Sequence, residues 1–91
     1  MNAPLPSLVP LATLAPGTRC RVMAVSGEGG IRRRLLEMGL CTGVEVAVLR
    51  RAPLGDPVEL RLRGYLLSLR RDQAALILVA VLAGDDLRAS A

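Results

Sequence analysis

Hydrophobic and polar residues alternate along three stretches of the chain, residues 19–25, 44–49 and 58–63. This period of two is typical of strands that bury one face and expose the other. Two further apolar runs, 65–69 and 76–81, predict two more short strands, with glycine, proline and polar residues at the turns. A flat sheet would leave its leucine-rich edges open to aggregation. The pattern therefore favours a small closed barrel of about five strands.

A different spacing predicts one short α-helix over about residues 31–38. Its apolar positions recur at i, i+4 and i+7, and they are Ile31, Leu35 and Met38. We expect this stripe to face the core, and we expect Gly39 to end the helix in a left-handed conformation as part of a Schellman motif. Leu36 lies off the stripe, so we expect its side chain to be exposed. The fold class is therefore mainly β, with one helix set among the strands.

Two shorter segments complete the pattern. Leu8, Leu11 and Leu14 recur every three residues before a Pro-Gly pair, which predicts a short helical turn that closes one end of the core. Residues 70–73 are polar and are expected to form a simple turn before the last strand.

The composition limits the chain to one domain with an aliphatic core. Of its 91 residues 52% are hydrophobic, and Tyr65 is the only aromatic residue. A chain of this length forms a single domain, which we place at residues 8–82. The proline-rich segment 1–7 and the small polar segment 85–91 are expected to be flexible tails. So many leucines in a small domain leave apolar surface exposed, which favours a partner or self-association.

The basic residues are all arginine, because the chain has neither lysine nor histidine, and its net charge is +4. The absence of lysine excludes a P-loop and a Schiff base. The absence of histidine excludes an imidazole base or metal ligand. No pair of carboxylates stands in a recognisable acid–base context. We therefore expect neither enzymatic activity nor a bound cofactor.

The two cysteines, Cys20 and Cys41, form no C-x-x-C motif and no metal-ligand spacing. We interpret them as small apolar residues of a reducing cytosol, although the sequence leaves a disulfide between them open. A ferrous-ion site would need histidines or converging carboxylates. Asp56 and Glu59 flank one turn, and 85–86 is an Asp pair in the C-terminal tail. No metal site is predicted.

The chain shows no signal for export or membrane insertion. Its N-terminus lacks a basic region followed by an apolar run. The longest apolar run, residues 74–84, is about half the length that spans a bilayer. The sequence therefore predicts a cytoplasmic protein.

Several motifs, taken in order and spacing, together resemble one family. They are Leu11-x-x-Leu14-x-x-Gly17, Arg34-Leu35-Leu36-Glu37-Met38-Gly39-Leu40 with Gly43 and Val46, Ala52-Pro53-Leu54-Gly55-Asp56-Pro57, Gly64-Tyr65, and Leu69-Arg70 with Ala74 and Ile77. Over about residues 8–82 the chain resembles the FeoA family, small cytosolic proteins associated with bacterial ferrous-iron uptake. Thr42 is a departure, since the family commonly has proline before the glycine at position 43.

The resemblance implies an SH3-like barrel and an accessory role beside FeoB, a membrane ferrous-iron permease whose cytosolic part is a GTPase. We hypothesise that this protein docks on that cytosolic region, and so meets the membrane only through the permease, and modulates its nucleotide cycle or assembly. Charged helix residues would orient docking, and two apolar residues would anchor it. The candidate residues are Arg32, Arg33, Arg34, Leu36, Glu37 and Tyr65. The simpler interpretation of each arginine is a solvated helix face.

Two other functions fit parts of the sequence. The same barrel occurs as the C-terminal domain of metal-responsive repressors that resemble DtxR. The 91 residues include no helix-turn-helix and no metal-binding helical domain before the barrel, so we do not expect a free-standing repressor. Nucleic-acid binding is suggested by a sequence pI near 10.5. Against it, Tyr65 alone provides no platform for stacked bases, and acidic residues are interleaved with the arginines. We therefore expect no nucleic-acid partner.

Overall fold

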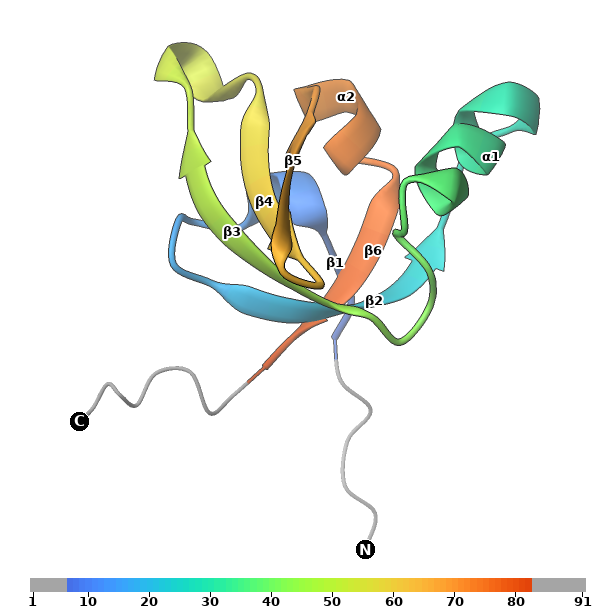
Figure 1. Cartoon of the computed structure of the whole chain (residues 1–91), viewed down its shortest axis with the longest axis horizontal. Coiled ribbons are helices and arrows are strands. Elements are labelled where there is room, and N and C mark those ends of the chain that lie inside the picture. Colours follow the sequence, from blue (N-terminus) through green and yellow to red (C-terminus); the bar gives the residue numbers. More distant parts are fainter. Residues whose placement is uncertain (1–6, 83–91) are drawn as a thin grey trace, which may run out of the picture.

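The computed structural model describes residues 7–82, which form a strongly curved antiparallel sheet with short helices at one end (Figure 1). The tails predicted at 1–7 and 85–91 lie outside the described residues, except for Ser7. The strands are β1 (Val9–Pro10), β2 (Arg19–Val25), β3 (Glu45–Arg51), β4 (Val58–Leu62), β5 (Tyr65–Leu69) and β6 (Ile77–Val81). The helical elements are α1 (Gly29–Glu37), α2 (Arg71–Ala74) and two 3₁₀ turns, η1 (Leu11–Thr13) and η2 (Pro53–Gly55).

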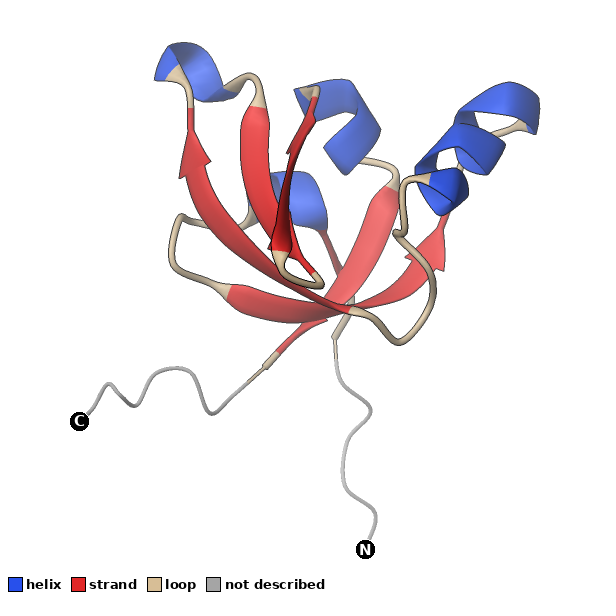
Figure 2. Ribbon diagram, viewed as in Figure 1, coloured by secondary structure: helices blue, strands red, loops and turns tan. Residues whose placement is uncertain are grey.

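The six strands pair in the order β1-β6-β2-β3-β4-β5, and every pairing is antiparallel. The sheet curls, so that β5 stands between β4 and β6 in the view of Figures 1 and 2. Within residues 7–82 no ladder joins the two edge strands, β1 and β5. Instead α2, which follows β5, contacts η1, which follows β1. The barrel is therefore closed by helical turns where we expected strands.

The core lies inside the curl and is entirely aliphatic apart from one thiol. Alternate residues of the strands point inward, as the period of two in the sequence predicts. β4 shows this most clearly, because Val58, Leu60 and Leu62 are fully buried while Arg61 is exposed. Cys20 on β2 is also fully buried. These inward residues, together with Leu11 and Leu35 from the helical turns, form one cluster.

The structure has one strand and one short α-helix more than the about five strands and one helix that the pattern predicts. β1 is an additional strand, in which Val9 pairs with Val79. Its two residues are too few to show an alternating pattern. The polar turn expected at 70–73 is the short helix α2, and Gln73 Oε1 accepts a hydrogen bond from Arg70 N at 3.0 Å at its start. The helical turn expected near Leu11 is confirmed as η1.

Helix α1 begins at Gly29, two residues earlier than predicted, and its end is as expected. Gly39 has φ +105°, its N–H donates to Leu36 O at 3.0 Å, and Leu40 N donates to Leu35 O at 3.2 Å. These two bonds are the Schellman motif. The core stripe was only partly right, because Leu35 is buried and Met38 is half-buried, whereas the Ile31 side chain is 53% exposed. The apolar side chains that pack onto the barrel therefore come from the second half of the helix.

Arg51 ties the start of the domain to β3. Its Nε donates to Leu14 O at 3.2 Å, and its Nη2 donates to the carbonyls of both Ala12 and Leu14. The guanidinium is half-buried and presents its donors to main-chain oxygens around η1. A fork of several N–H groups is the feature that lets one arginine satisfy two carbonyls at once.

Candidate partner-binding surface

Helix α1 projects from the rim of the barrel, beside the end of β2 (Figure 1). Its position follows from the loop before it, where Gly27 has φ +100° and allows a sharp change of direction. Arg32 then holds the helix to the strand, because its Nε donates to Val25 O at 3.1 Å. Arg32 therefore has a positioning contact that the sequence did not reveal.

A groove separates the first half of α1 from α2. Ile31 and Arg34 line it from α1, and Gln73 and Leu76 line it from the opposite side. The hollow comprises two adjoining parts of about 360 and 490 Å³, which share Ile31 and Gln73. A Cβ on Gly27 would lie 3.3 Å from Leu76 Cδ1 and 3.7 Å from Ile31 Cγ2, so both apolar side chains approach the same point.

Tyr65 lies at the other end of the helix. Its hydroxyl donates to Met38 O at 3.3 Å, although the side chain is 50% exposed. This bond satisfies a carbonyl at the C-terminus of α1, which has no partner within the helix. Tyr65 thus supports the helix end, and its ring edge remains available to a partner.

The structure distributes the predicted site residues around α1. Arg33 and Glu37 are exposed, and Arg34 faces the groove. Leu36 was expected to be exposed but is half-buried. Tyr65 joins them only at the C-terminal end. The predicted set is therefore not one continuous patch.

Sequence reasoning missed Ile31 as a surface residue, because its helical spacing from Leu35 placed it in the core stripe. The signal that could have corrected this is the pair Gly29-Gly30 immediately before it. Because glycine has no side chain to bury, a helix that begins with two glycines makes little apolar contact with the core in its first turn. Ile31 is the exposed apolar residue of the groove.

The carboxylates considered for a metal have other partners. Asp56 Oδ1 accepts a hydrogen bond from Arg71 N at 3.0 Å, and Glu59 forms an ion pair with Arg50 at 3.1 Å. In the part of the chain that the structure describes, no three His, Cys, Asp or Glu side chains gather as a metal site. The Asp pair at 85–86 lies outside that part.

The two thiols are both free and lie in different environments, since Cys20 is buried and Cys41 is exposed. Burial raises the pKa of the Cys20 thiol from its ordinary 9.0 to about 11. A thiol with a raised pKa is a poor nucleophile and a poor metal ligand, because both roles need the thiolate. Cys20 is therefore suited to packing and not to chemistry.

The family model described as "FeoA domain" matches residues 9–81, nearly the whole described part of the chain. The chain belongs to the FeoA family. A curated FeoA relative is the Fe(2+) transport protein A/Fe(2+) transporter FeoB fusion protein of Porphyromonas gingivalis. It is 40% identical over 75 residues, which are 82% of this chain and 9% of the fusion protein.

Solved FeoA structures share the fold. The FeoA-like protein of Clostridium acetobutylicum superimposes with a TM-score of 0.80 at 38% identity, covering 86% of this chain and 91% of that one. The zinc-complexed FeoA of Stenotrophomonas maltophilia, described as a procaryotic SH3 domain protein, has a TM-score of 0.65 at 28% identity, covering 82% and 91%. The expected mainly-β, SH3-like fold is thereby confirmed.

A manganese-dependent transcriptional repressor also contains this fold, with a TM-score of 0.78 at 20% identity. The likeness covers 87% of this chain and 44% of the repressor. At that identity it shows shared architecture alone.

Among residues 7–82, no helix is both long enough and apolar enough to cross a membrane.

Proposed function

We propose that this protein is a small cytosolic accessory of ferrous-iron uptake, without enzymatic activity of its own. It binds the cytosolic GTPase region of a FeoB-type permease and modulates the permease's activity or assembly. The observation that supports this most is the fusion relative, in which a FeoA segment 40% identical to this chain is joined covalently to a FeoB transporter. Covalent joining raises the effective concentration of two partners and is favourable where they act together.

The surface proposed for docking is α1 together with its groove. Ile31 is an exposed apolar side chain in a hollow, which is the usual form of an interface anchor. Arg34 stands beside it, and Arg33 and Glu37 are exposed on the same helix. Exposed charges around an apolar anchor increase the rate of encounter and fix orientation. We therefore assign anchoring to Ile31 and steering to the exposed arginines.

Arg32 and Tyr65 have a different role in this proposal. Arg32 holds α1 to Val25, and Tyr65 holds the opposite end at Met38. Both bonds fix the angle at which α1 projects from the barrel. A docking helix with a fixed angle loses less conformational freedom on binding than a mobile one.

Calorimetry with the isolated cytosolic GTPase region of the cognate permease tests the proposal, in the presence of GTP, GDP and neither nucleotide. We expect binding, and we expect Ile31→Ala to weaken it by about tenfold or more because the anchor is lost. Leu54→Ala is the matched control, since Leu54 is also an exposed apolar side chain but lies on η2. Equal affinities for wild type and Ile31→Ala would remove α1 as the docking surface.

A charge reversal separates steering from anchoring. Arg33→Glu combined with Arg34→Glu should slow association and weaken its decline with added salt, because the attraction that salt screens is then lost. Arg61→Glu with Arg63→Glu makes the same change in net charge on the sheet. Loss of binding in the sheet variant alone would contradict a role for the helix. No binding of the wild type in any nucleotide state would overturn the proposed function itself.

A further inference from the structure

Four arginines gather on the outer face of the sheet, away from α1. Arg19 and Arg21 extend from β2. Arg61 lies on β4, and Arg63 lies in the turn just after it. Strand β3 runs between β2 and β4. The register places Arg19 opposite Ala47, and Ala47 opposite Arg61, so these three form one row across three strands. We call this set of four arginines the arginine face.

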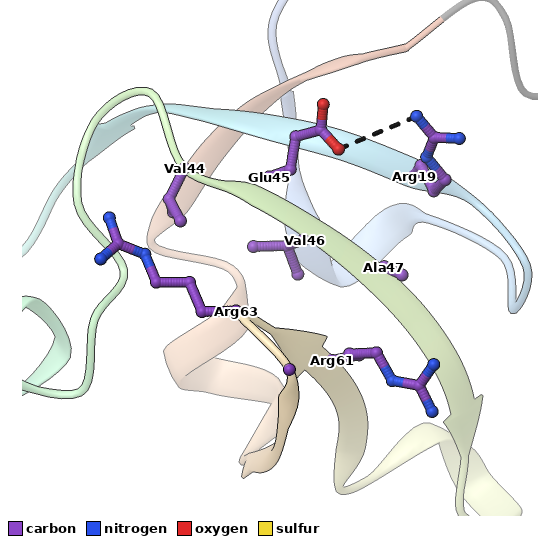
Figure 3. Close-up of a pocket in the computed structure, with 8 residues that line it drawn as sticks. Arg19, Val44, Glu45, Val46, Ala47, Arg61 and Arg63 are labelled. Carbon is purple, nitrogen blue, oxygen red and sulfur yellow. Dashed lines mark ion pairs between the residues drawn. The ribbon is translucent and has the colours of Figure 1, made fainter.

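The arginine face is hollowed along its middle. A trough of about 330 Å³ lies between β2 and β4, and it is lined by three of the four arginines, Glu45, Ala47 and Gly64 among others. Ala47 and Gly64 are the reason for the hollow, because neither carries a side chain large enough to fill the space between flanking arginines. Figure 3 shows Arg61 and Arg63 extending away from one another on one bank of the trough, with Arg19 and Glu45 on the other.

The charges of this face are unequal. Glu45 is the single carboxylate that lines the trough, and it pairs with Arg19 at 3.8 Å and with Arg21 at 3.4 Å. Glu59, two residues before Arg61 on the same side of β4, pairs with Arg50 at 3.1 Å. Within residues 7–82 no ion pair joins Arg61 or Arg63 to an acidic side chain. The bank formed by β4 and the turn after it therefore carries two exposed guanidinium groups that form no ion pair within residues 7–82. Arginine binds carboxylate and phosphate groups through paired N–H donors.

We infer that the arginine face binds an extended acidic segment of a partner protein, with the segment lying along the trough and its carboxylates meeting Arg61 and Arg63. Two observations favour a segment over a small anion. The two guanidinium groups point in different directions, so a ligand must bring negative groups to separate points. Arg63 lies in the turn after β4, with φ +52°, so the two arginines leave the sheet at different points, and an extended chain can reach both because alternate side chains on one side of it lie at about 6.6 Å intervals.

Carboxylates fit this face better than phosphates. Glu45 shows that a carboxylate is accommodated between two of these arginines. No aromatic ring lines the trough, and the hydroxyl of Tyr65 is bound to Met38 at the helix end, so bases of a single strand would find no stacking platform. A flat lipid surface would not enter a trough between side chains. The inference does not depend on the proposed function, because it concerns another surface.

Fluorescence anisotropy with a short labelled peptide of alternating glutamate and threonine tests the inference. Threonine keeps the peptide extended, and a peptide of alternating glutamine and threonine is the uncharged control. We expect only the acidic peptide to bind, with amide NMR shifts confined to β2, β3 and β4. Absence of binding, or tighter binding of oligothymidylate or of phosphatidylglycerol vesicles, would overturn the inference.

Matched variants distinguish the trough from the overall charge. Arg61→Gln with Arg63→Gln should weaken peptide binding by about tenfold or more, whereas Arg33→Gln with Arg34→Gln, the same charge change on α1, should leave it within about twofold. Glu45→Gln should strengthen binding by about threefold, because it removes the one carboxylate that lines the trough. Its control is Glu37→Gln, which removes a helix carboxylate. Equal effects within either pair would show non-specific attraction and overturn the inference.

Discussion

The two faces of strands β2, β3 and β4 have opposite character, one apolar and buried, the other charged and exposed. On the inner face Val22 and Leu60 are completely buried, and all neighbouring inward side chains are apolar. On the outer face the same strands present Arg21, Glu45 and Arg61 to solvent. One residue along a strand therefore separates a side chain that holds the fold from one that is free to contact a partner. Stability and recognition can be changed separately in this sheet.

The largest expected effect is on the inner face. Leu60→Ala should lower the free energy of unfolding by about 2–5 kcal/mol, because it removes buried methyl groups and leaves a cavity in a closed core. Its neighbour Arg61→Ala should change stability by no more than about 0.5 kcal/mol, since Arg61 is exposed and has no ion pair in the described chain. Urea unfolding followed by circular dichroism measures both. Similar losses of unfolding free energy in the two variants would mean that the outer face contributes to stability as much as the inner face.

The buried thiol of Cys20, on the inner face, should make the stability of the protein depend on pH. Burial raises the pKa of its thiol from 9.0 to about 11, so above pH 9 the unfolded chain releases a proton that the folded chain retains. The stabilising contribution is fully present below pH 9, and it should fall by up to about 1.4 kcal/mol per unit between pH 9 and 11. Urea unfolding across that range should show a shallower decline for Cys20→Ala than for wild type, and equal declines would contradict the effect of burial.

Two glycines of the α1 region should respond in opposite directions to alanine. Gly39 has φ +105°, and an added Cβ would lie 3.1 Å from the Tyr65 hydroxyl and 3.2 Å from Leu62 Cδ2. Gly39→Ala should therefore cost about 1–2 kcal/mol. Gly30 lies within the helix with nothing near its Cβ position, so Gly30→Ala should be neutral or stabilise by up to about 1 kcal/mol. Thermal unfolding distinguishes them, and a gain in stability at Gly39 would contradict the Schellman geometry.

The smallest effect is expected for an ion pair on the outer surface. Arg50 and Glu59 are direct partners in the β3–β4 ladder, and their charged groups are 3.1 Å apart. Both side chains contact solvent, so a double-mutant cycle to alanine should give a coupling of about 0.2–1 kcal/mol. A coupling as large as the Leu60→Ala effect would show that outer contacts also hold the fold.

Most of the barrel could be predicted because burial leaves a period of two in each long strand. β4 is the clearest case, where every second residue from Val58 is buried. The elements that sequence reasoning missed are short. β1 has two residues and α2 has four, about one period of a strand or helix pattern each, so neither pattern can recur. Their existence depends on tertiary contacts, since β1 pairs with β6 and α2 contacts η1.

The candidate surfaces were less predictable than the fold. Ile31 has the helical spacing of a core residue, yet it is exposed, because the apolar side chains that pack onto the barrel come from the second half of α1. The spacing of apolar residues does not indicate how far a helix projects from the core. The arginine face was also missed, although each arginine is visible in the alternating pattern. Its trough exists because β3 lies between β2 and β4 and brings Ala47 between two arginines. Strand order is information that alternation alone does not carry.

The contact made by Arg51 has a consequence for the order of folding. Its guanidinium reaches carbonyls that lie 37 and 39 residues earlier in the chain. Contacts between such distant positions form late, because the loop between them must first be closed at a cost in entropy. The segment around η1 is therefore held in place only after β3 has joined the sheet. During refolding, amide hydrogens of β3 and β4 should become protected from exchange before those near Leu14.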